Sequence, residues 1–213
     1  MDVLFFVCIL GVIAVIPIHF SSVEHLRLEE KYGRNKGRRI GKIYSLISGW
    51  GFFLFWAGLW FSPQSRFIVP VFPNLAVTVP VASFTIQIAH LTIFVPFFFI
   101  GAWLGIAGVK ETTLRVAETH RTEKIITSGV YSVVRHPQYL GGLFAHVGIS
   151  FLLSASYSLL STLLMVALVY LISRKEETEL VREFGKEYED YRKKVPMFMP
   201  KYGRSQKARV KLA

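Results

Sequence analysis

The chain has 213 residues, of which 52% are hydrophobic and 15% aromatic, and its mean hydropathy is +0.42. This composition is too apolar for an ordinary soluble domain and is typical of a polytopic membrane protein. The net charge of +11 therefore favours contact with anionic lipid headgroups over binding to nucleic acid, for which no motif is present. The single cysteine, Cys8, excludes an internal disulfide framework and a thiolate metal cluster, and we predict no metal site.

Three apolar runs in the first half of the chain are predicted to span the membrane as helices. They lie at about residues 3–20, 43–61 and 84–109. The first run lacks the basic start and the cleavage site of a signal peptide, so we expect it to be retained. The third contains Pro96, which predicts a kink or a break. A segment rich in Lys and Arg separates the first two spans, and a proline-rich outer loop at 62–83 separates the second and third.

Two further apolar runs follow a basic connector at 110–134. Residues 137–153 and 157–172 are joined by only three residues, which predicts an antiparallel hairpin. With five spans and an outside N-terminus, every strongly basic segment falls on the cytoplasmic side, as the positive-inside rule requires. We therefore predict a single all-α domain, a polytopic transmembrane helical bundle with its C-terminus in the cytoplasm.

The charged segment after Arg174 keeps a helical pattern of apolar residues at three- and four-residue steps. This pattern predicts a cytoplasmic amphipathic helix with Glu177 near the middle of its apolar face, so that at least one carboxylate turns inward. Gly185 is expected to interrupt the helix and Pro196 to end it. The basic tail at 201–213 is expected to be disordered and to lie on acidic lipid.

The sequence Arg135-His136-Pro137-Gln138-Tyr139 stands at the entrance to the fourth apolar run. Pro137 suits the first position of a helix, so the helix is predicted to begin after His136. Its first-turn amides and Arg135 together could bind a carboxylate or a phosphate at the membrane surface. The alternative is an interfacial arginine that reaches the lipid headgroups beside an ordinary proline helix start.

The paired carboxylates Glu176 and Glu177 follow the fifth span. Both ends of a two-span hairpin lie on the same side of the membrane, so these carboxylates can meet Arg135 and His136. A zwitterionic ligand would suit such a site, with its carboxylate on the basic pair and its ammonium on the acidic pair. Alternatively, the two clusters neutralise each other in an interhelical salt bridge.

Three motifs at fixed spacing carry a family resemblance. They are Gly-Val-Tyr-x-x-Val-Arg-His-Pro-x-Tyr-x-Gly at 129–141, Glu-Glu-x-x-Leu-x-x-x-Phe-Gly-x-Glu-Tyr-x-x-Tyr at 176–191, and Val-Pro-x-Phe-x-Pro at 195–200. Together they resemble the integral-membrane methyltransferases, which comprise the isoprenylcysteine carboxyl methyltransferases and the phospholipid N-methyltransferases. The resemblance covers about residues 123–200. It implies a membrane-embedded site for S-adenosylmethionine and a lipid or prenylated substrate that enters from the bilayer.

The resemblance also implies roles for individual residues. Residues implied to lie on the cofactor or to shape its site are Gly129, Tyr131, Arg135, His136, Tyr139, Gly142, Glu176 and Glu177. Within this set the glutamates would hold the amino group, whereas Gly142, with Gly141, would allow close approach of the cofactor or of a neighbouring helix.

Two further residues are candidates for contact with the methyl acceptor. Arg174 could neutralise an acceptor carboxylate or a lipid phosphate, or simply anchor its helix at the membrane interface. His146 shares a helical face with Tyr139, Gly142 and Ser150, which could line a substrate channel or form a polar packing seam.

The function that these features favour is methyl transfer to a lipophilic acceptor, most consistent with a carboxyl methyltransferase of the isoprenylcysteine type. A phospholipid N-methyltransferase is the alternative. An NADPH-dependent sterol reductase, which has a similar Arg-His motif, and a non-catalytic membrane protein are weaker alternatives. The sequence does not choose the acceptor.

Overall fold

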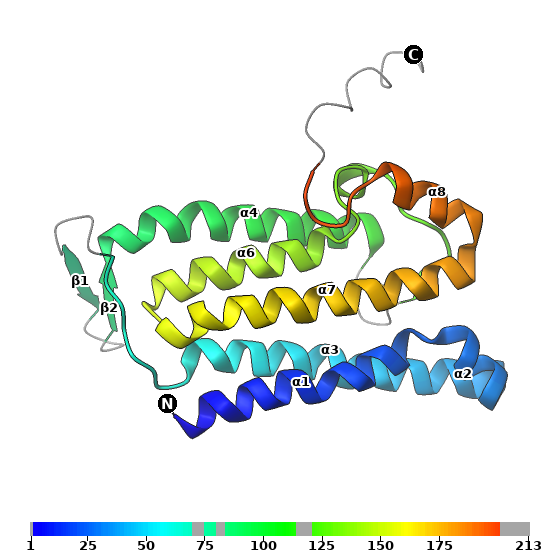
Figure 1. Cartoon of the computed structure of the whole chain (residues 1–213), viewed down its shortest axis with the longest axis horizontal. Coiled ribbons are helices and arrows are strands. Elements are labelled where there is room, and N and C mark those ends of the chain that lie inside the picture. Colours follow the sequence, from blue (N-terminus) through cyan, green and yellow to red (C-terminus); the bar gives the residue numbers. More distant parts are fainter. Residues whose placement is uncertain (1, 70–74, 80–83, 114–120, 201–213) are drawn as a thin grey trace, which may run out of the picture.

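The computed structural model describes residues 2–69, 75–79, 84–113 and 121–200, which form a bundle of long helices lying side by side (Figure 1). The described elements are α1 (Val3–Val23), α2 (His25–Tyr32), α3 (Arg34–Phe61), β1 (Ala76–Val79), β2 (Phe84–Gln87), α4 (Ile88–Thr112), η2 (Gly129–Ser132), α6 (Pro137–Leu152), α7 (Ser156–Phe184) and α8 (Lys186–Lys194).

Four of these helices, α1, α3, α4 and α7, are long and apolar enough to cross a membrane. Their outward-facing side chains are apolar too, as Leu160 (71% exposed) and Leu163 (81% exposed) illustrate on α7. A soluble protein rarely exposes so much apolar surface, whereas lipid covers it at no cost. The predicted membrane bundle is therefore confirmed. The fourth predicted span corresponds to α6, which has only 16 residues and lies between α4 and α7 (Figure 1).

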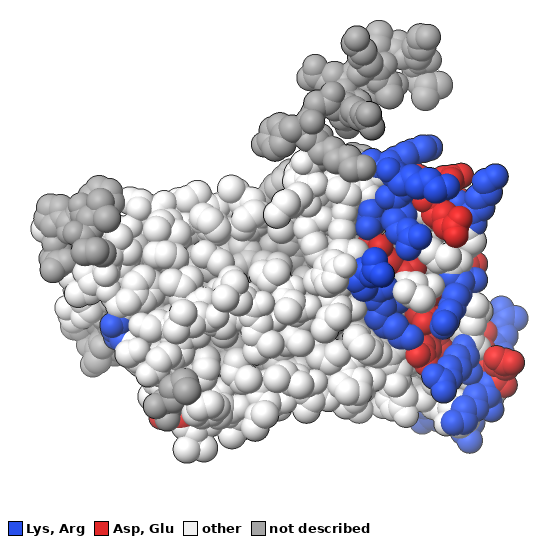
Figure 2. Space-filling view, viewed as in Figure 1, with Lys and Arg blue, Asp and Glu red and all other residues white. Residues whose placement is uncertain are grey.

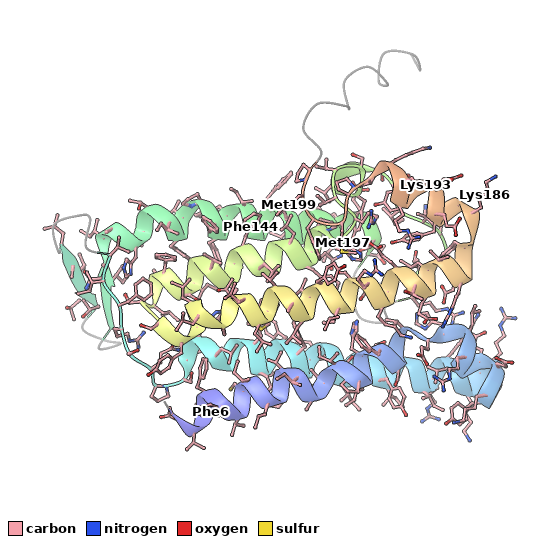
Figure 3. All side chains as sticks on the ribbon, in the orientation of Figure 1. Phe6, Phe144, Lys186, Lys193, Met197 and Met199 are labelled. Carbon is pink, nitrogen blue, oxygen red and sulfur yellow. The ribbon has the colours of Figure 1, made fainter. Side chains whose placement is uncertain are left out.

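Charged side chains are concentrated at one end of the bundle, around α2, α8 and the adjoining end of α7 (Figure 2). The long apolar sides are almost free of charge in this view. At the charged end, Lys186 and Lys193 on α8 point away from the bundle (Figure 3). One polar end beside an apolar band suits a protein whose charged end contacts water and lipid headgroups.

The structure differs from the all-α prediction at a small antiparallel hairpin. Strands β1 and β2 pair with Ala76 opposite Gln87 and Thr78 opposite Thr85. The prolines nearby suggested a loop, although three consecutive β-branched residues at 77–79 suit a strand. Residues 84–87 were predicted as the start of the third span, but they form β2 and helix α4 begins after them. The rest of the predicted loop falls partly on 70–74 and 80–83, which lie outside the described residues.

Small residues bring α4 and α6 unusually close. A Cβ atom placed on Gly101 would lie 2.6 Å from the carbonyl oxygen of Gly141, and the reverse substitution is equally blocked. A Cβ on Gly142 would lie 3.2 Å from the Trp56 ring. Both glycines of α6 therefore serve contacts between helices, which is one of the two roles considered for them.

The charged C-terminal half of α7 continues the transmembrane helix without a break as far as Phe184. Gly185 then adopts a φ of 56°, which glycine tolerates best, and the chain turns into α8. Both the predicted interruption and the inward carboxylate are confirmed, since Glu177 is only 2% exposed. Helix α4 continues through Pro96. The predicted basic tail, 201–213, lies outside the described residues.

Candidate active site

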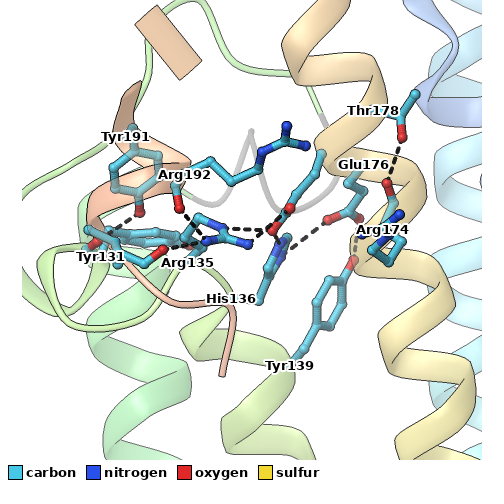
Figure 4. Close-up of polar contacts among 11 residues, drawn as sticks. Tyr131, Arg135, His136, Tyr139, Arg174, Glu176, Thr178, Tyr191 and Arg192 are labelled. Carbon is cyan, nitrogen blue, oxygen red and sulfur yellow. Dashed lines mark hydrogen bonds and ion pairs between the residues drawn. The ribbon is translucent and has the colours of Figure 1, made fainter. Parts of the chain in front are cut away.

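The start of α6 is fixed by Arg135. Helix α6 begins at Pro137 with His136 as its N-cap, as predicted. The Arg135 guanidinium donates two hydrogen bonds to Glu177, from Nε to Oε1 (2.7 Å) and from Nη2 to Oε2 (3.0 Å) (Figure 4). Its Nη1 also donates to the carbonyl oxygens of Arg192 (3.0 Å) and Val195. The side chains of Arg135 and Glu177 are 8% and 3% exposed, so this is a buried bidentate ion pair.

The second of the two sequence interpretations therefore holds for this pair. The basic and acidic clusters meet, as the hairpin argument required, but Arg135 and Glu177 neutralise each other and do not leave a free anion site. His136 adds a third bond to the same carboxylate, with its Nε2 3.0 Å from Oε1 of Glu177. The backbone N–H of Arg135 also donates to the Pro196 carbonyl (3.0 Å). This ion pair joins the start of α6, helix α7 and the segment after α8.

Glu176 has a different environment from its neighbour. The Tyr139 hydroxyl donates to its Oε1, and His19 Nε2 lies 3.1 Å from the same oxygen (Figure 4 shows the tyrosine contact). Nδ1 of His136 lies 3.6 Å from Oε2. Glu176 is thus placed by three helices, α1, α6 and α7, and keeps 15% of its side chain exposed. Of the two glutamates, it is the one that faces a cavity.

The cavity lies at the charged end of the bundle and has a volume of about 210 Å³. Its lining comes from α2, from the segment before η2, and from η2, α6, α7 and α8, together with single residues at the ends of α1 and α4. The lining residues are Val23, His25, Thr112, Thr122, Lys124, Ile125, Ile126, Tyr131, Arg135, His136, Gln138, Tyr139, Glu176, Glu179, Leu180, Glu183, Tyr188 and Tyr191. Aromatic and aliphatic groups are combined with a few charged ones, as is usual in a small-molecule site.

Tyr131 is held at the cavity wall by polar contacts at both ends. Its hydroxyl accepts a hydrogen bond from Gln138 Nε2 (3.1 Å), and its carbonyl accepts one from the Tyr191 hydroxyl (2.7 Å). Burial raises the pKa of the Tyr131 phenol, so the group stays neutral. Gly129 has a φ of 53° and carries the Glu111 side chain against its Cα. This glycine is the first residue of η2 and does not line the cavity.

The segment before η2 is tied to α2 by an ion pair. Arg121 Nη1 lies 2.5 Å from Oε1 of Glu29, which also accepts from Arg38 Nε (3.0 Å). The cavity-lining residues Thr122, Lys124, Ile125 and Ile126 follow directly. Burial alone would raise the pKa of Glu29, but the hydrogen bonds and charges of Arg121 and Arg38 outweigh it and lower the pKa below its ordinary value of 4.5.

This tether gives a pH-dependent prediction. The pKa of Glu29 is lowered in the folded state. Its ion pairs therefore stabilise the folded state fully above about pH 4.5, and this stabilisation is lost as the pH falls through the lowered pKa. Glu29→Gln should therefore speed hydrogen exchange of residues 121–126 at pH 7. In wild type, exchange of these residues should accelerate as Glu29 becomes protonated below pH 4.5, and Glu29→Gln should lack this acceleration. The exposed Glu30→Gln is the control. Equal exchange in wild type and Glu29→Gln would contradict the tether.

Several predicted site residues lie outside the cavity lining. They are Gly129, Gly142, His146, Arg174 and Glu177. Conversely, sequence reasoning missed the contributions of α1 and α2. His19 and His25 are both buried, and His19 could have been noticed as a polar residue within an apolar span.

His146 is enclosed in the bundle and has a structural environment. Its Nδ1 accepts hydrogen bonds from the indole N–H groups of Trp56 (2.8 Å) and Trp60 (2.9 Å). Indoles can only donate, so Nε2 carries the proton and donates to the Ser158 carbonyl (2.9 Å). The ring is 0% exposed. Both nitrogens are therefore used in joining α3, α6 and α7, which favours the packing role over the catalytic one.

His146→Ala should accordingly lower stability and leave the cavity intact. The substitution leaves two indole N–H groups and one carbonyl without their hydrogen-bond partner. The unfolding free energy is expected to fall by about 2–3 kcal/mol. Unfolding in detergent measures this loss, and ligand titration should show affinity within about threefold of wild type. A variant of unchanged stability that has lost methyl transfer would instead support a catalytic role.

The cavity residues fit S-adenosylmethionine by their chemistry. The molecule carries a positive sulfonium, an ammonium and a carboxylate, so it is a cation overall. With the lining histidines counted as neutral, the carboxylates of Glu176, Glu179 and Glu183 outnumber the cationic groups of Lys124 and Arg135. A flat apolar base could lie against the aromatic part of the wall. Acidic groups, a minority of basic ones and an aromatic surface are the partners that this ligand requires.

Comparison with known proteins finds a family that matches about half of the chain. Residues 84–187, from β2 to the first turn of α8, match the family model described as phospholipid methyltransferase. The protein-S-isoprenylcysteine O-methyltransferase of Schizosaccharomyces pombe is 35% identical over 98 residues, covering 44% of this chain and 40% of that protein. The human protein of the same name is 34% identical over 84 residues, 39% of this chain and 30% of that protein.

A bacterial relative has a different acceptor in its name. The methanethiol S-methyltransferase 2 of Bradyrhizobium diazoefficiens is 38% identical over 72 residues, which are 34% of this chain and 27% of that protein. The chain thus spans well under half the length of these three relatives. No solved structure matches it.

Four membrane-length helices and a charged cavity at one end define a multi-pass membrane protein with an enzyme-like site. Residues 84–187 thus resemble the phospholipid methyltransferase family, whose members are membrane methyltransferases dependent on S-adenosylmethionine.

Proposed function

We propose that this protein transfers a methyl group from S-adenosylmethionine to a lipophilic acceptor at the membrane. The observation that carries the proposal is Glu176, a residue of the matched region whose partly exposed carboxylate contacts Tyr139 and His19 and lines the cavity. Such a carboxylate is suited to the cofactor ammonium. His136 and Lys124 also line the cavity and would serve the cofactor carboxylate, because Arg135 is engaged by Glu177.

The bound cofactor would supply an activated methyl group on its sulfonium. The residues of the chain would then act by positioning and by excluding water, which are the main sources of acceleration for a direct displacement. Glu176 would fix one end of the cofactor, and Tyr131 would form part of the wall around the other. The buried pair of Arg135 and Glu177 would hold these elements in register without touching the reacting atoms.

We infer a carboxylate acceptor of the isoprenylcysteine type, as in the names of the eukaryotic relatives. A carboxylate is already a nucleophile and needs no base, whereas an amine must first lose a proton. Arg174 is exposed on α7, two residues before Glu176, and is the cation we propose for the acceptor carboxylate. Phospholipid N-methylation is the runner-up, favoured by the description of the matching family.

The proposed membrane arrangement follows from the charge distribution. We place the charged end of the bundle, with the cavity, on the cytoplasmic side and the N-terminus outside. In this arrangement α6 is the fourth and shortest of five spans. The basic residues around α2 and α8 would lie against anionic headgroups.

Methyl transfer to a panel of acceptors tests this function. Detergent-purified protein is incubated with methyl-labelled S-adenosylmethionine and a farnesylcysteine derivative, phosphatidylethanolamine or an alkanethiol. The proposal predicts label in the farnesylcysteine derivative that alkali releases, because methyl esters hydrolyse in base. Base-stable label in phosphatidylethanolamine would establish the runner-up, and no transfer to any acceptor would contradict the proposal.

Arg174→Leu refines the same assay. Loss of one charge-assisted hydrogen bond should raise KM for the carboxylate acceptor about tenfold while affinity for S-adenosylmethionine is unchanged. Arg174→Lys, which keeps the charge, should retain part of this binding. An unchanged KM in Arg174→Leu would assign the arginine to the membrane interface instead.

A further inference from the structure

One face of α7 supplies four residues to the cavity wall at helical spacing: Glu176, Glu179, Leu180 and Glu183. Glu176 and Glu183 stand seven residues apart, so they are separated by two turns, or about 10 Å along the helix axis. The cavity wall thus presents carboxylates at two levels along one helix. The resemblance to methyltransferases assigns a role to the first level only.

The other two glutamates of this face, Glu179 and Glu183, differ in their partners. Glu179 is 5% exposed, and its Oε1 accepts hydrogen bonds from Lys175 (2.8 Å) and Arg182 (2.8 Å). For Glu183, by contrast, no hydrogen bond or ion pair is found among the described residues. Its carboxylate is half-buried in the cavity wall. Of the two, Glu183 is therefore the one with acceptor oxygens left for a ligand.

The surroundings of Glu183 suit a nucleoside. Tyr188 and Tyr191 on α8 form an apolar cluster with Ile125 and Leu180, and these four residues also line the cavity. A purine base can lie against such a surface. A ribose next to the base presents two neighbouring hydroxyls, and a carboxylate can accept from both. The wall at this level offers an apolar surface and a carboxylate side by side.

Resting on the proposed function, we propose that Glu183 accepts hydrogen bonds from the ribose hydroxyls of S-adenosylmethionine. The cofactor then lies along α7 with its ammonium at Glu176 and its adenosine two turns further along. Glu183 is a specificity residue for the nucleoside half of the cofactor. It does not touch the transferred methyl group.

Calorimetric titration of Glu183→Gln and wild type with S-adenosylmethionine tests this role. Glutamine keeps the size of the side chain but loses its charge, so binding should weaken about tenfold or more. Glu187→Gln is the matched control, because Glu187 is an exposed glutamate on α8 outside the cavity lining. Its affinity should equal that of wild type.

Deoxy analogues of S-adenosylhomocysteine identify the group that Glu183 contacts. Removing the 2′- or 3′-hydroxyl should weaken binding to wild type but cause little further loss in Glu183→Gln. If a missing hydroxyl weakened binding equally in wild type and in Glu183→Gln, the ribose assignment would be wrong. It would also be wrong if Glu183→Gln instead abolished the effect of removing the adenine amino group. If wild type bound S-adenosylmethionine while Glu183→Gln bound it equally well, this proposal alone would fail. If wild type bound no S-adenosylmethionine, the proposed function would fail as well.

Discussion

Arg135→Ala should be the most destabilising single change in the site, lowering the free energy of unfolding by about 3–5 kcal/mol. The substitution leaves Glu177, whose side chain is 3% exposed, without its bidentate partner. It also removes the donors to the Arg192 and Val195 carbonyls, which hold the segment after α8. A buried charge without its partner costs far more than the pair contributes when intact.

Unfolding in detergent measures the effect, and a double variant separates charge from size. Arg135→Met combined with Glu177→Leu removes both charges, and should be more stable than Arg135→Met alone. If Arg135→Ala lowered the free energy of unfolding by less than about 1 kcal/mol, the Arg135–Glu177 pair would not hold α6, α7 and the segment after α8 together. If the single and double variants were equally stable, a charged Glu177 without Arg135 would carry no penalty in Arg135→Met.

Glu176→Gln should have the second largest effect of the substitutions considered. It should change the affinity for S-adenosylmethionine more than the free energy of unfolding. Affinity for S-adenosylmethionine should fall about 10- to 100-fold, because the neutral amide cannot pair with the ammonium. Stability should change less than in Arg135→Ala, since 15% of the Glu176 side chain is exposed and glutamine can still accept from Tyr139. Methyl transfer should decline in parallel with the affinity.

Tyr139→Phe is the matched control for this prediction. It removes one donor to Glu176 and leaves the carboxylate in place. Its affinity should lie between those of wild type and Glu176→Gln. If Glu176→Gln bound as tightly as wild type, Glu176 would not be the ammonium partner.

Local sequence signals predicted local structure well. Pro137 marked the start of α6 and Gly185 the end of α7, because each residue has a backbone preference that decides its position. The helical spacing after Arg174 also predicted that Glu177 turns inward. These features depend on neighbours in the chain, which the sequence displays directly.

Contacts between distant residues were harder to predict. The sequence left open whether Arg135 would bind a ligand or Glu177, because both arrangements satisfy the same charges. Nothing in the local pattern of α1 indicated that His19 would lie beside Glu176, 157 positions later. The hairpin at β1 and β2 was missed because the nearby prolines favoured a loop and the apolar run from residue 84 favoured a helix. Each of these depends on tertiary packing.

We expect the cavity at the charged end to bind S-adenosylmethionine. Isothermal titration of the detergent-purified protein with S-adenosylmethionine, and separately with NADPH, tests it most directly. We predict saturable binding of S-adenosylmethionine at micromolar concentration, weakened by Glu176→Gln and retained by His146→Ala. Binding of NADPH in place of S-adenosylmethionine would indicate a reductase, and binding of neither would contradict an enzymatic role for this cavity.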